Sequence, residues 1–176
     1  MAGHIGDTVS QHWNTPPRIL KLIYEMWPFV DLDPCSNEHS IVKSRSRIQL
    51  PGDGLKVNWT KYETVFCNPP YGRDKKRGTS IEDWIYKAYL SSNNSFLRTE
   101  IILLIPAATE TDFWDEYVWH GASDAICFIK GRVNFMLNGK TTPGFSSRGS
   151  ALVYHGIHTE RFKGIFKKLG AVIDGT

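Results

Sequence analysis

The segment Asn68-Pro69-Pro70-Tyr71 carries the most specific chemistry in this sequence. Two consecutive prolines stiffen a turn, because each fixes its own backbone and restricts the residue before it. A rigid turn holds the Asn68 amide oxygen and a neighbouring carbonyl in fixed directions, and two such acceptors match the two hydrogens of an exocyclic amino group. Tyr71 adds a flat surface for a planar ring. The alternative is a plain proline turn with a capping asparagine, but the apolar strand before the segment and Gly72 after it favour a functional site.

The elements that must position this segment alternate between strand and helix. Apolar runs predict strands at 29–33, 47–50, 64–67, 100–105, 125–129, 132–137 and 150–155. Helical spacing predicts helices from Pro16-Pro17 to Pro28, with Thr15 as the capping residue, and at 80–90, 112–119 and 161–169. Asn138-Gly139 predicts a tight turn between strands.

This alternation predicts an α/β fold with a mostly parallel sheet, to which the late strands are added antiparallel at one edge. In such sheets ligands bind at the carboxyl ends of the strands. Asp33-Pro34-Cys35-Ser36 and Asn68-Pro69-Pro70-Tyr71 both directly follow predicted strands. We therefore expect these two segments to share one site.

Length and composition indicate a single soluble domain. The chain has 176 residues, of which 41% are hydrophobic, and no apolar run is long enough to cross a membrane. The first residues lack the basic-then-apolar pattern of a secretory signal. We expect the short polar segment 1–12 to form a flexible arm and 13–176 to form one domain. Three widely spaced cysteines argue against a disulfide framework or a zinc site and favour a reducing cytoplasm. We expect no metal.

The net charge of +3 permits a nucleic-acid partner without requiring one. Basic residues gather in three clusters, at 43–47, 73–77 and 163–168. Any one cluster, taken singly, is more typical of a solvated surface.

The ordered motifs of the chain resemble a known family. Asn-Pro-Pro-Tyr is the signature of amino-methyltransferases that use S-adenosylmethionine, and from Trp13 to about His155 the chain is similar to the phage-type DNA N-6-adenine-methyltransferase (Dam) family. The resemblance is carried by Trp13-Asn14-Thr15-Pro16, Asp31-Leu32-Asp33-Pro34-Cys35-Ser36, Asn58-Trp59, the segment 65–72, Leu104-Ile105-Pro106-Ala107 and the segment 128–135. It implies a Rossmann-like S-adenosylmethionine-dependent methyltransferase fold and site-specific methylation of adenine N6 in DNA. A bacterial cytoplasm, phage or prophage origin and a link to restriction–modification would accompany that function.

On the cofactor side, the resemblance implies that S-adenosylmethionine lies at the end of the first strand. The usual glycine-rich turn is replaced here by Asp33-Pro34-Cys35-Ser36-Asn37. Asp33 would hold the ammonium group of the methionine moiety, and backbone groups around Ser36 would contact its carboxylate. The alternative is that this segment is a plain turn without a ligand. Asp53 would accept from the adenine amino group, unless it belongs to a simple Gly-Asp-Gly turn. The cofactor-binding candidates are Trp13, Thr15, Pro16, Asp31, Asp33, Pro34, Ser36, Asp53 and Asn68, although Trp13 and Thr15-Pro16 could equally be a core residue and a helix cap.

On the substrate side, an amino group inside a duplex is reached by flipping the base out. Asn68, Pro69, Pro70 and Tyr71 are the catalytic candidates, and Tyr71 and Phe135 are predicted to form two walls around the flipped base, Phe135 being equally compatible with a core position. Basic side chains near the entrance would contact DNA phosphates. The candidates are Arg73, Lys75, Lys76, Arg77, Arg132, Lys140 and Arg148.

The residues alone leave alternatives to adenine methylation open. The same tetrapeptide occurs in methyltransferases that act on cytosine N4, RNA bases or protein glutamine, and a silent DNA-binding protein could keep the fold. No segment is long enough for a separate target-recognition domain. Sequence recognition would then come from the loops or from a dimer, and the chain is expected to be a monomer or a homodimer.

Overall fold

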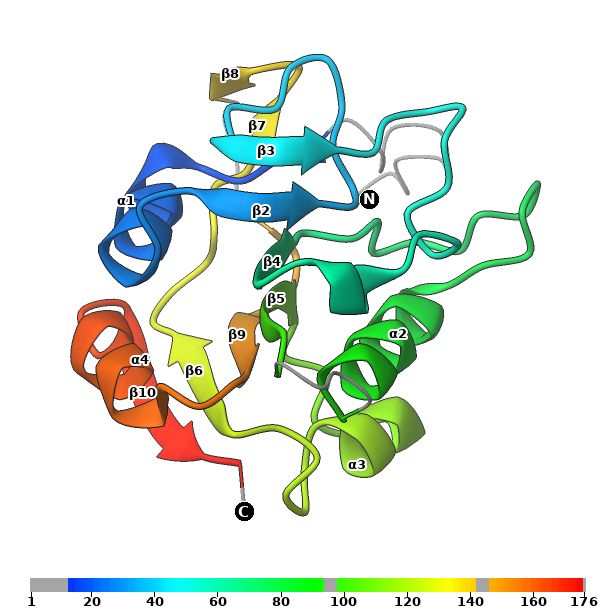
Figure 1. Ribbon diagram of the computed structural model, residues 1–176. Helices are drawn as coiled ribbons and strands as arrows, with labels where there is room; N and C mark the ends of the chain where they lie inside the picture. Colours follow the sequence, from blue (N-terminus) through cyan, green and yellow to red (C-terminus); the bar gives the residue numbers. More distant parts are fainter. Residues whose placement is uncertain (1–12, 94–97, 142–145, 176) are drawn as a thin grey trace, which may run out of the picture.

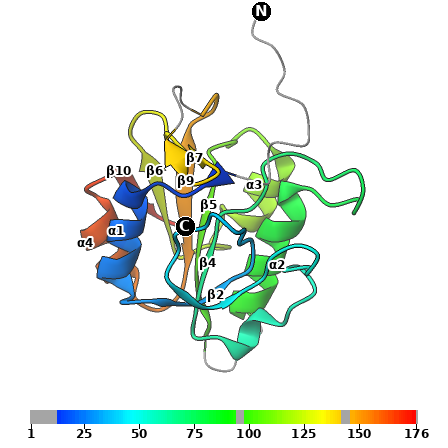
Figure 2. The ribbon, with the colours of Figure 1, turned by 90° about the horizontal axis from the view of Figure 1, so that it is seen from above.

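The protein is a three-layer α/β structure. The computed structural model describes residues 13–93, 98–141 and 146–175. A central sheet is covered by α1 (Pro17–Met26) and α4 (Thr159–Phe166) on one side and by α2 (Ile81–Asn93) and α3 (Asp112–Tyr117) on the other (Figures 1 and 2). None of the described helices is both long and apolar enough to span a bilayer.

Seven strands form the main sheet, in the order β10-β6-β9-β5-β4-β2-β3. Their bounds are β2 (Val30–Asp33), β3 (Ser44–Arg47), β4 (Thr64–Cys67), β5 (Glu100–Pro106), β6 (Ala125–Ile129), β9 (Ser150–His155) and β10 (Gly170–Asp174). β2, β3, β4 and β5 pair in parallel, whereas β9 is antiparallel to both of its neighbours, β5 and β6, and β10 is antiparallel to β6. The sheet is therefore mixed, and β2 to β6 share one direction.

A small second sheet joins the start of the chain to a late hairpin. β1 (Trp13–Asn14) pairs with β7 (Met136–Leu137), which pairs with β8 (Lys140–Thr141). The turn between β7 and β8 is Asn138-Gly139, and both residues have positive φ, as a tight hairpin turn requires. The predicted turn is confirmed.

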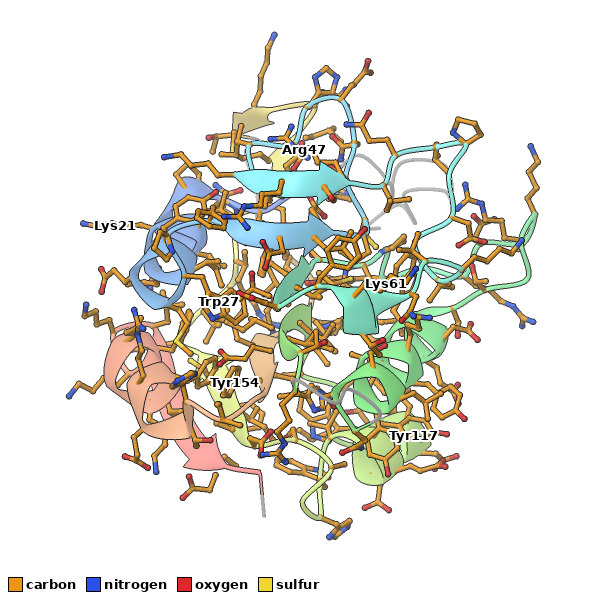
Figure 3. The ribbon with its side chains drawn as sticks, in the orientation of Figure 1. Lys21, Trp27, Arg47, Lys61, Tyr117 and Tyr154 are labelled. Atoms are coloured by element: carbon orange, nitrogen blue, oxygen red, sulfur yellow. The ribbon has the colours of Figure 1, made fainter. Side chains whose placement is uncertain are left out.

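The central strands are buried on both faces, as the apolar run at 100–105 predicts. Ile102 and Leu104 of β5 pack in the core beneath α1 and α4, while Ile101, Leu103 and Ile105 pack in the core beneath α2 and α3. Figure 3 shows Trp27 and Tyr154 on the first side and Tyr117 on α3, on the second. The alternation of side chains along one strand thus supplies both cores.

The structure corrects several boundaries. Pro16, not Thr15, is the N-cap of α1, with Pro17 in the first turn. The strand expected at 47–50 lies earlier, at Ser44–Arg47, and only Met136–Leu137 of the predicted 132–137 strand is extended and paired. The prediction that the late strands are added antiparallel at one edge is only partly right: β9 is antiparallel but lies between β5 and β6, β6 runs in the direction of β5, and the antiparallel edge strand is β10, which the sequence did not predict. The α/β class is confirmed.

Candidate active site at the carboxyl ends of the parallel strands

A cavity of about 300 Å³ lies where β2, β3 and β4 end. Pocket volumes of this order suit small-molecule ligands. Its walls come from the turn after β2, the loop after β3, and the segment from the prolines to α2: Pro34, Cys35, Ser36, Asn37, Glu38, Ile48, Gln49, Leu50, Gly52, Gly54, Pro70, Gly72, Asp74, Arg77, Thr79, Ser80 and Trp84. The two segments singled out in the sequence therefore border one cavity.

A close backbone approach builds one wall of this cavity. A Cβ on Gly54 would lie 2.0 Å from the Pro34 carbonyl oxygen, so only glycine fits between these loops. The Gly54 carbonyl in turn accepts a hydrogen bond from Trp59 Nε1 at 2.9 Å. The loop after β3 is thus locked onto the turn after β2.

The turn after β2 is held by a buried carboxylate. Asp33 accepts hydrogen bonds from the Cys35 N–H at 3.2 Å and the Ser40 hydroxyl at 3.3 Å. Burial raises the pKa of Asp33 to about 6, and these hydrogen bonds oppose the rise. Asp33 does not line the cavity itself, so in this structure it positions the turn.

Ser36 supplies the polar atom that points to a ligand. Ser36 lines the cavity and is 8% exposed, and its hydroxyl makes no hydrogen bond of good geometry, although it lies near enough to the Asp33 carboxylate to lower the pKa of that group. A buried hydroxyl without a good hydrogen bond is costly. A ligand oxygen or nitrogen in the cavity would remove that cost.

The segment 68–71 leaves β4 at the rim of the cavity. Asn68 is half-buried directly after Cys67, Pro69 is buried, and Pro70 lines the cavity. The Tyr71 hydroxyl donates to the Leu104 carbonyl of β5 at 3.2 Å. The rigid turn predicted from the two prolines is therefore anchored to the next strand.

Tyr71 and Phe135 touch each other directly. Their ring centroids are 5.7 Å apart and the rings are nearly perpendicular, at 87°. Edge-to-face contact leaves no gap for a base between the rings. The expected aromatic sandwich is not present in this arrangement: Phe135, which is buried and precedes β7, supports Tyr71 instead.

Two predicted cofactor carboxylates have other partners. Asp31 accepts from the Thr64 backbone N–H at 3.2 Å and pairs with Arg45 at 3.1 Å, at the start of β4 rather than its end. Asp53 accepts from the Leu55 N–H and lies 3.7 Å from Lys56 Nζ. Neither lines the cavity, so the geometry favours the turn interpretation of Asp53 and a strand-pairing role for Asp31.

The early motif reaches the cavity indirectly, through Asn14. Its Nδ2 donates to Asn37 Oδ1 at 3.0 Å, and its Oδ1 accepts from the Gly139 N–H at 3.3 Å. Asn37 lines the cavity, whereas Trp13, Thr15 and Pro16 do not. The sequence motif around Asn14 predicts a place beside the cofactor, but nothing in it marks Asn14 as the residue that joins the three segments.

Most of the predicted DNA-contacting residues follow or precede strands at the sheet end that holds the cavity, whereas Lys140 lies on the small second sheet. A short hairpin closed by Asp74 and Thr79 carries Lys75, Lys76 and Arg77 beyond the end of β4, where it projects in green at the right of Figure 1. Arg132 follows the carboxyl end of β6, and Arg148 precedes β9, which runs in the opposite direction. Lys140 is exposed on β8, and Arg73 precedes the hairpin. Of these basic residues, Arg77 lines the cavity, and the contact of the others with DNA stays a prediction.

Several cavity residues could not be recognised from the sequence. Trp84 and Ser80 carry only a helix signal, Leu50 only a strand signal, and Thr79 lies in a predicted loop. A wider, more open hollow of about 790 Å³ lies between α2 and α3, rimmed by Asp112, Asp115 and Glu116. It contains none of the predicted site residues, and its acidic rim is unsuited to DNA. Across the described parts of the chain, His, Cys, Asp and Glu form no group that could hold a metal ion.

The sequence matches the model of a known protein family. The sequence model of a protein family described as DNA N-6-adenine-methyltransferase (Dam) matches residues 3–163, well over half of the chain. A search of curated proteins found no match.

Proposed function

We propose how the residues at the cavity carry out the reaction of this chain. The chain belongs to the DNA N-6-adenine-methyltransferase (Dam) family and is therefore an adenine-specific DNA methyltransferase. The family implies S-adenosylmethionine as methyl donor and DNA as substrate. The observation that carries the proposal is that the rim of one cavity is shared by the turn after β2 and by Pro70 and Gly72 of the segment after Asn68.

The cavity fits the methyl donor. Ile48, Leu50 and Trp84 offer apolar surface for an adenosine moiety, and the Ser36 hydroxyl offers a polar contact at the turn after β2. A mixed sheet with its cavity at the carboxyl ends of parallel strands supports a Rossmann-like methyltransferase fold. We assign Pro34 and Ser36 to cofactor contact and Asp33 to positioning.

The chain's own groups orient the acceptor. S-adenosylmethionine supplies an electrophilic methyl group on a positively charged sulfur. The Asn68 amide oxygen and the Pro69 carbonyl accept hydrogen bonds from the adenine amino group, which directs its nitrogen lone pair towards the cavity. With the cofactor bound, the nitrogen would displace the sulfur in line, so that S-adenosylhomocysteine leaves as the N–methyl bond forms and the surplus proton passes from nitrogen to solvent. Catalysis rests on orientation and electrostatics.

The substrate surface comprises Arg73, Lys75, Lys76, Arg132, Lys140 and Arg148, with Tyr71 as the stacking surface for the flipped base. Residues 13–176 would act as one domain, with recognition by loops at the cavity edge. It stays a prediction that the protein is a monomer or a homodimer, that it is of phage origin, and that it acts in a bacterial cytoplasm with a link to restriction–modification. The predicted arm at 1–12 lies outside the described residues.

Methyl transfer to DNA is the direct test. The protein is incubated with methyl-labelled S-adenosylmethionine and unmethylated duplex DNA, and the digested nucleosides are separated. We expect label on N6-methyldeoxyadenosine. Label on N4-methyldeoxycytidine, or transfer only to RNA or protein, would contradict the assignment of the acceptor.

Asn68→Ala tests the catalytic role. We expect it to lower the methylation rate by about 100-fold or more, the order found when one preorganised hydrogen-bonding group is removed, while cofactor affinity measured by calorimetry stays within a few-fold. Asn58→Ala is the matched control, because Asn58 is exposed and caps only the short helix at Trp59–Lys61. Equal rates in the two variants would remove Asn68 from the mechanism.

A further inference from the structure

Arg77 is placed differently from the other basic residues of its hairpin. Its backbone N–H donates to Asp74 Oδ1 at 3.1 Å, and the hairpin is closed by hydrogen bonds between Asp74 and Thr79 at 2.8 and 3.2 Å. Gly78 has a φ of 71°, which lets the chain reverse. All three basic residues of the hairpin are exposed, but Arg77 alone of them lines the cavity, whereas Lys75 and Lys76 do not.

The guanidinium is the one cationic group among the described cavity residues. Its Nε lies 3.6 Å from Asp74 Oδ2, too far for a good hydrogen bond, and the Arg77 side chain is 30% exposed. Within the described chain, no hydrogen bond engages its terminal nitrogens. Its field also reaches the turn after β2, where it lowers the pKa of the Cys35 thiol, although burial, the largest cause, raises that pKa overall.

An arginine with free terminal N–H groups at the rim of a cavity suits a planar anion. Guanidinium binds carboxylates through two parallel hydrogen bonds. The other charged residues that line the cavity, Glu38 and Asp74, are anionic and would repel a carboxylate. Ser36, whose buried hydroxyl has Asp33 nearby but makes no hydrogen bond of good geometry, lines the same cavity from the turn after β2.

We propose that Arg77 binds the carboxylate of the methionine moiety of S-adenosylmethionine, with Ser36 as a second donor, and does not contact DNA phosphate. This inference rests on the proposed function. It assigns two tasks to one hairpin: its tip, Lys75 and Lys76, faces the nucleic acid, and Arg77 closes over the cofactor.

A ligand without the carboxylate isolates this interaction. Affinities of the parent protein, Arg77→Gln, Arg77→Lys and the control Lys76→Gln are measured by calorimetry for S-adenosylmethionine and for its decarboxylated analogue. We expect Arg77→Gln to weaken S-adenosylmethionine binding by roughly 10- to 100-fold, the range for hydrogen bonds to a charged group. Its affinity for the analogue should change less than about threefold, Arg77→Lys should recover part of the loss, and Lys76→Gln should match the parent.

The outcomes separate the inference from the function on which it rests. Equal losses for both ligands would mean a general disturbance of the cavity and would overturn the inference. Unchanged cofactor affinity together with a weaker salt dependence of DNA binding would make Arg77 a phosphate-binding residue and overturn it too, while methyltransferase function stands. A parent protein that binds neither ligand would instead refute the proposed cofactor site. If Arg77→Gln fails to fold, the comparison of the two ligands rests on Arg77→Lys.

Discussion

Asp33 shows how one side chain connects folding with the site. Asp33 is 4% exposed, and its carboxylate organises the turn that forms one wall of the cavity. Burial raises its pKa to about 6 from the ordinary value of 3.8, because the charged form loses its hydration. The folded protein therefore binds a proton more tightly at this residue than the unfolded chain does.

The substitution Asp33→Asn tests this link through pH. Between the unfolded pKa and about 6 the folded state holds more protons, so the Asp33 contribution to stability is fully present at low pH and is lost as pH rises through 6. Compared with Asp33→Asn, the parent should lose up to about 3 kcal/mol of unfolding free energy between pH 4 and pH 7, since one pKa unit corresponds to about 1.4 kcal/mol. Urea unfolding of both proteins at several pH values measures this difference. A difference independent of pH would contradict the raised pKa.

Tyr71 shows what a motif cannot indicate about orientation. The sequence identifies an aromatic ring at the fourth position, but only the structure shows its hydroxyl on the Leu104 carbonyl and its ring against Phe135. Burial raises the pKa of Tyr71 well above its usual range, so the hydroxyl remains a proton donor to that carbonyl. Tyr71 thus fixes the catalytic turn relative to β5, in addition to offering a surface for the base.

At the scale of elements, the site depends on loops that meet closely. The loop after β3 crosses the turn after β2 with no room for a side chain at Gly54. Trp59, fully buried at the following short helix, fastens that loop through the Gly54 carbonyl. The Gly-Asp-Gly segment therefore serves the cavity through its glycine backbone rather than through the Asp53 carboxylate.

Two glycine-to-alanine substitutions compare this close approach with an open helix position. Gly54→Ala should cost about 1–3 kcal/mol of stability, as overpacking does, and weaken S-adenosylmethionine binding, because its Cβ forces the loops apart. Gly164→Ala in α4 meets nothing within 4 Å and should stabilise the protein by about 0.5–1 kcal/mol. Thermal unfolding and calorimetry measure both effects. Equal stability changes for the two variants would mean that the loops separate without cost.

Elements with long apolar runs were predictable, and those made by distant pairing were not. β4, β6 and β9 have the predicted bounds: Asn68-Pro69 ends β4, and glycines or polar turn residues flank β6 and β9. β1 and β7 are two residues long and exist through pairing across more than 120 positions, which no local pattern reveals. The two segments at the cavity were predictable because each directly follows a strand with a clear local pattern. The position of Arg77 at the cavity and the contribution of Trp84 were not, because both depend on how the loops and α2 pack against one another.

At the scale of the whole molecule, the distribution of charge matters more than its total. The net charge is only +3, but basic residues from the hairpin, from the chain after β6 and from the chain before β9 gather at the edge that holds the cavity. By contrast, Lys163 pairs with Glu160 and Asp174, and Lys168 pairs with Glu25. The late basic cluster is therefore largely engaged in ion pairs, and the cavity edge is the expected DNA surface.

Neutralising the hairpin tests that surface. The triple variant Arg73→Gln, Lys75→Gln, Lys76→Gln should weaken binding to duplex DNA and reduce the slope of log affinity against log salt by about 0.9 for each phosphate that is no longer neutralised. Cofactor affinity should be unchanged, and the ranking of target sequences should survive, because interactions with phosphates carry no base information. The control removes an equal charge at three exposed residues outside this edge, Lys21, Lys61 and Arg98; Lys21 projects from α1 and Lys61 precedes β4 (Figure 3). If both triple variants lower the slope equally, binding follows net charge alone and the hairpin does not bind DNA specifically; if only the control does, the DNA surface lies elsewhere on the molecule.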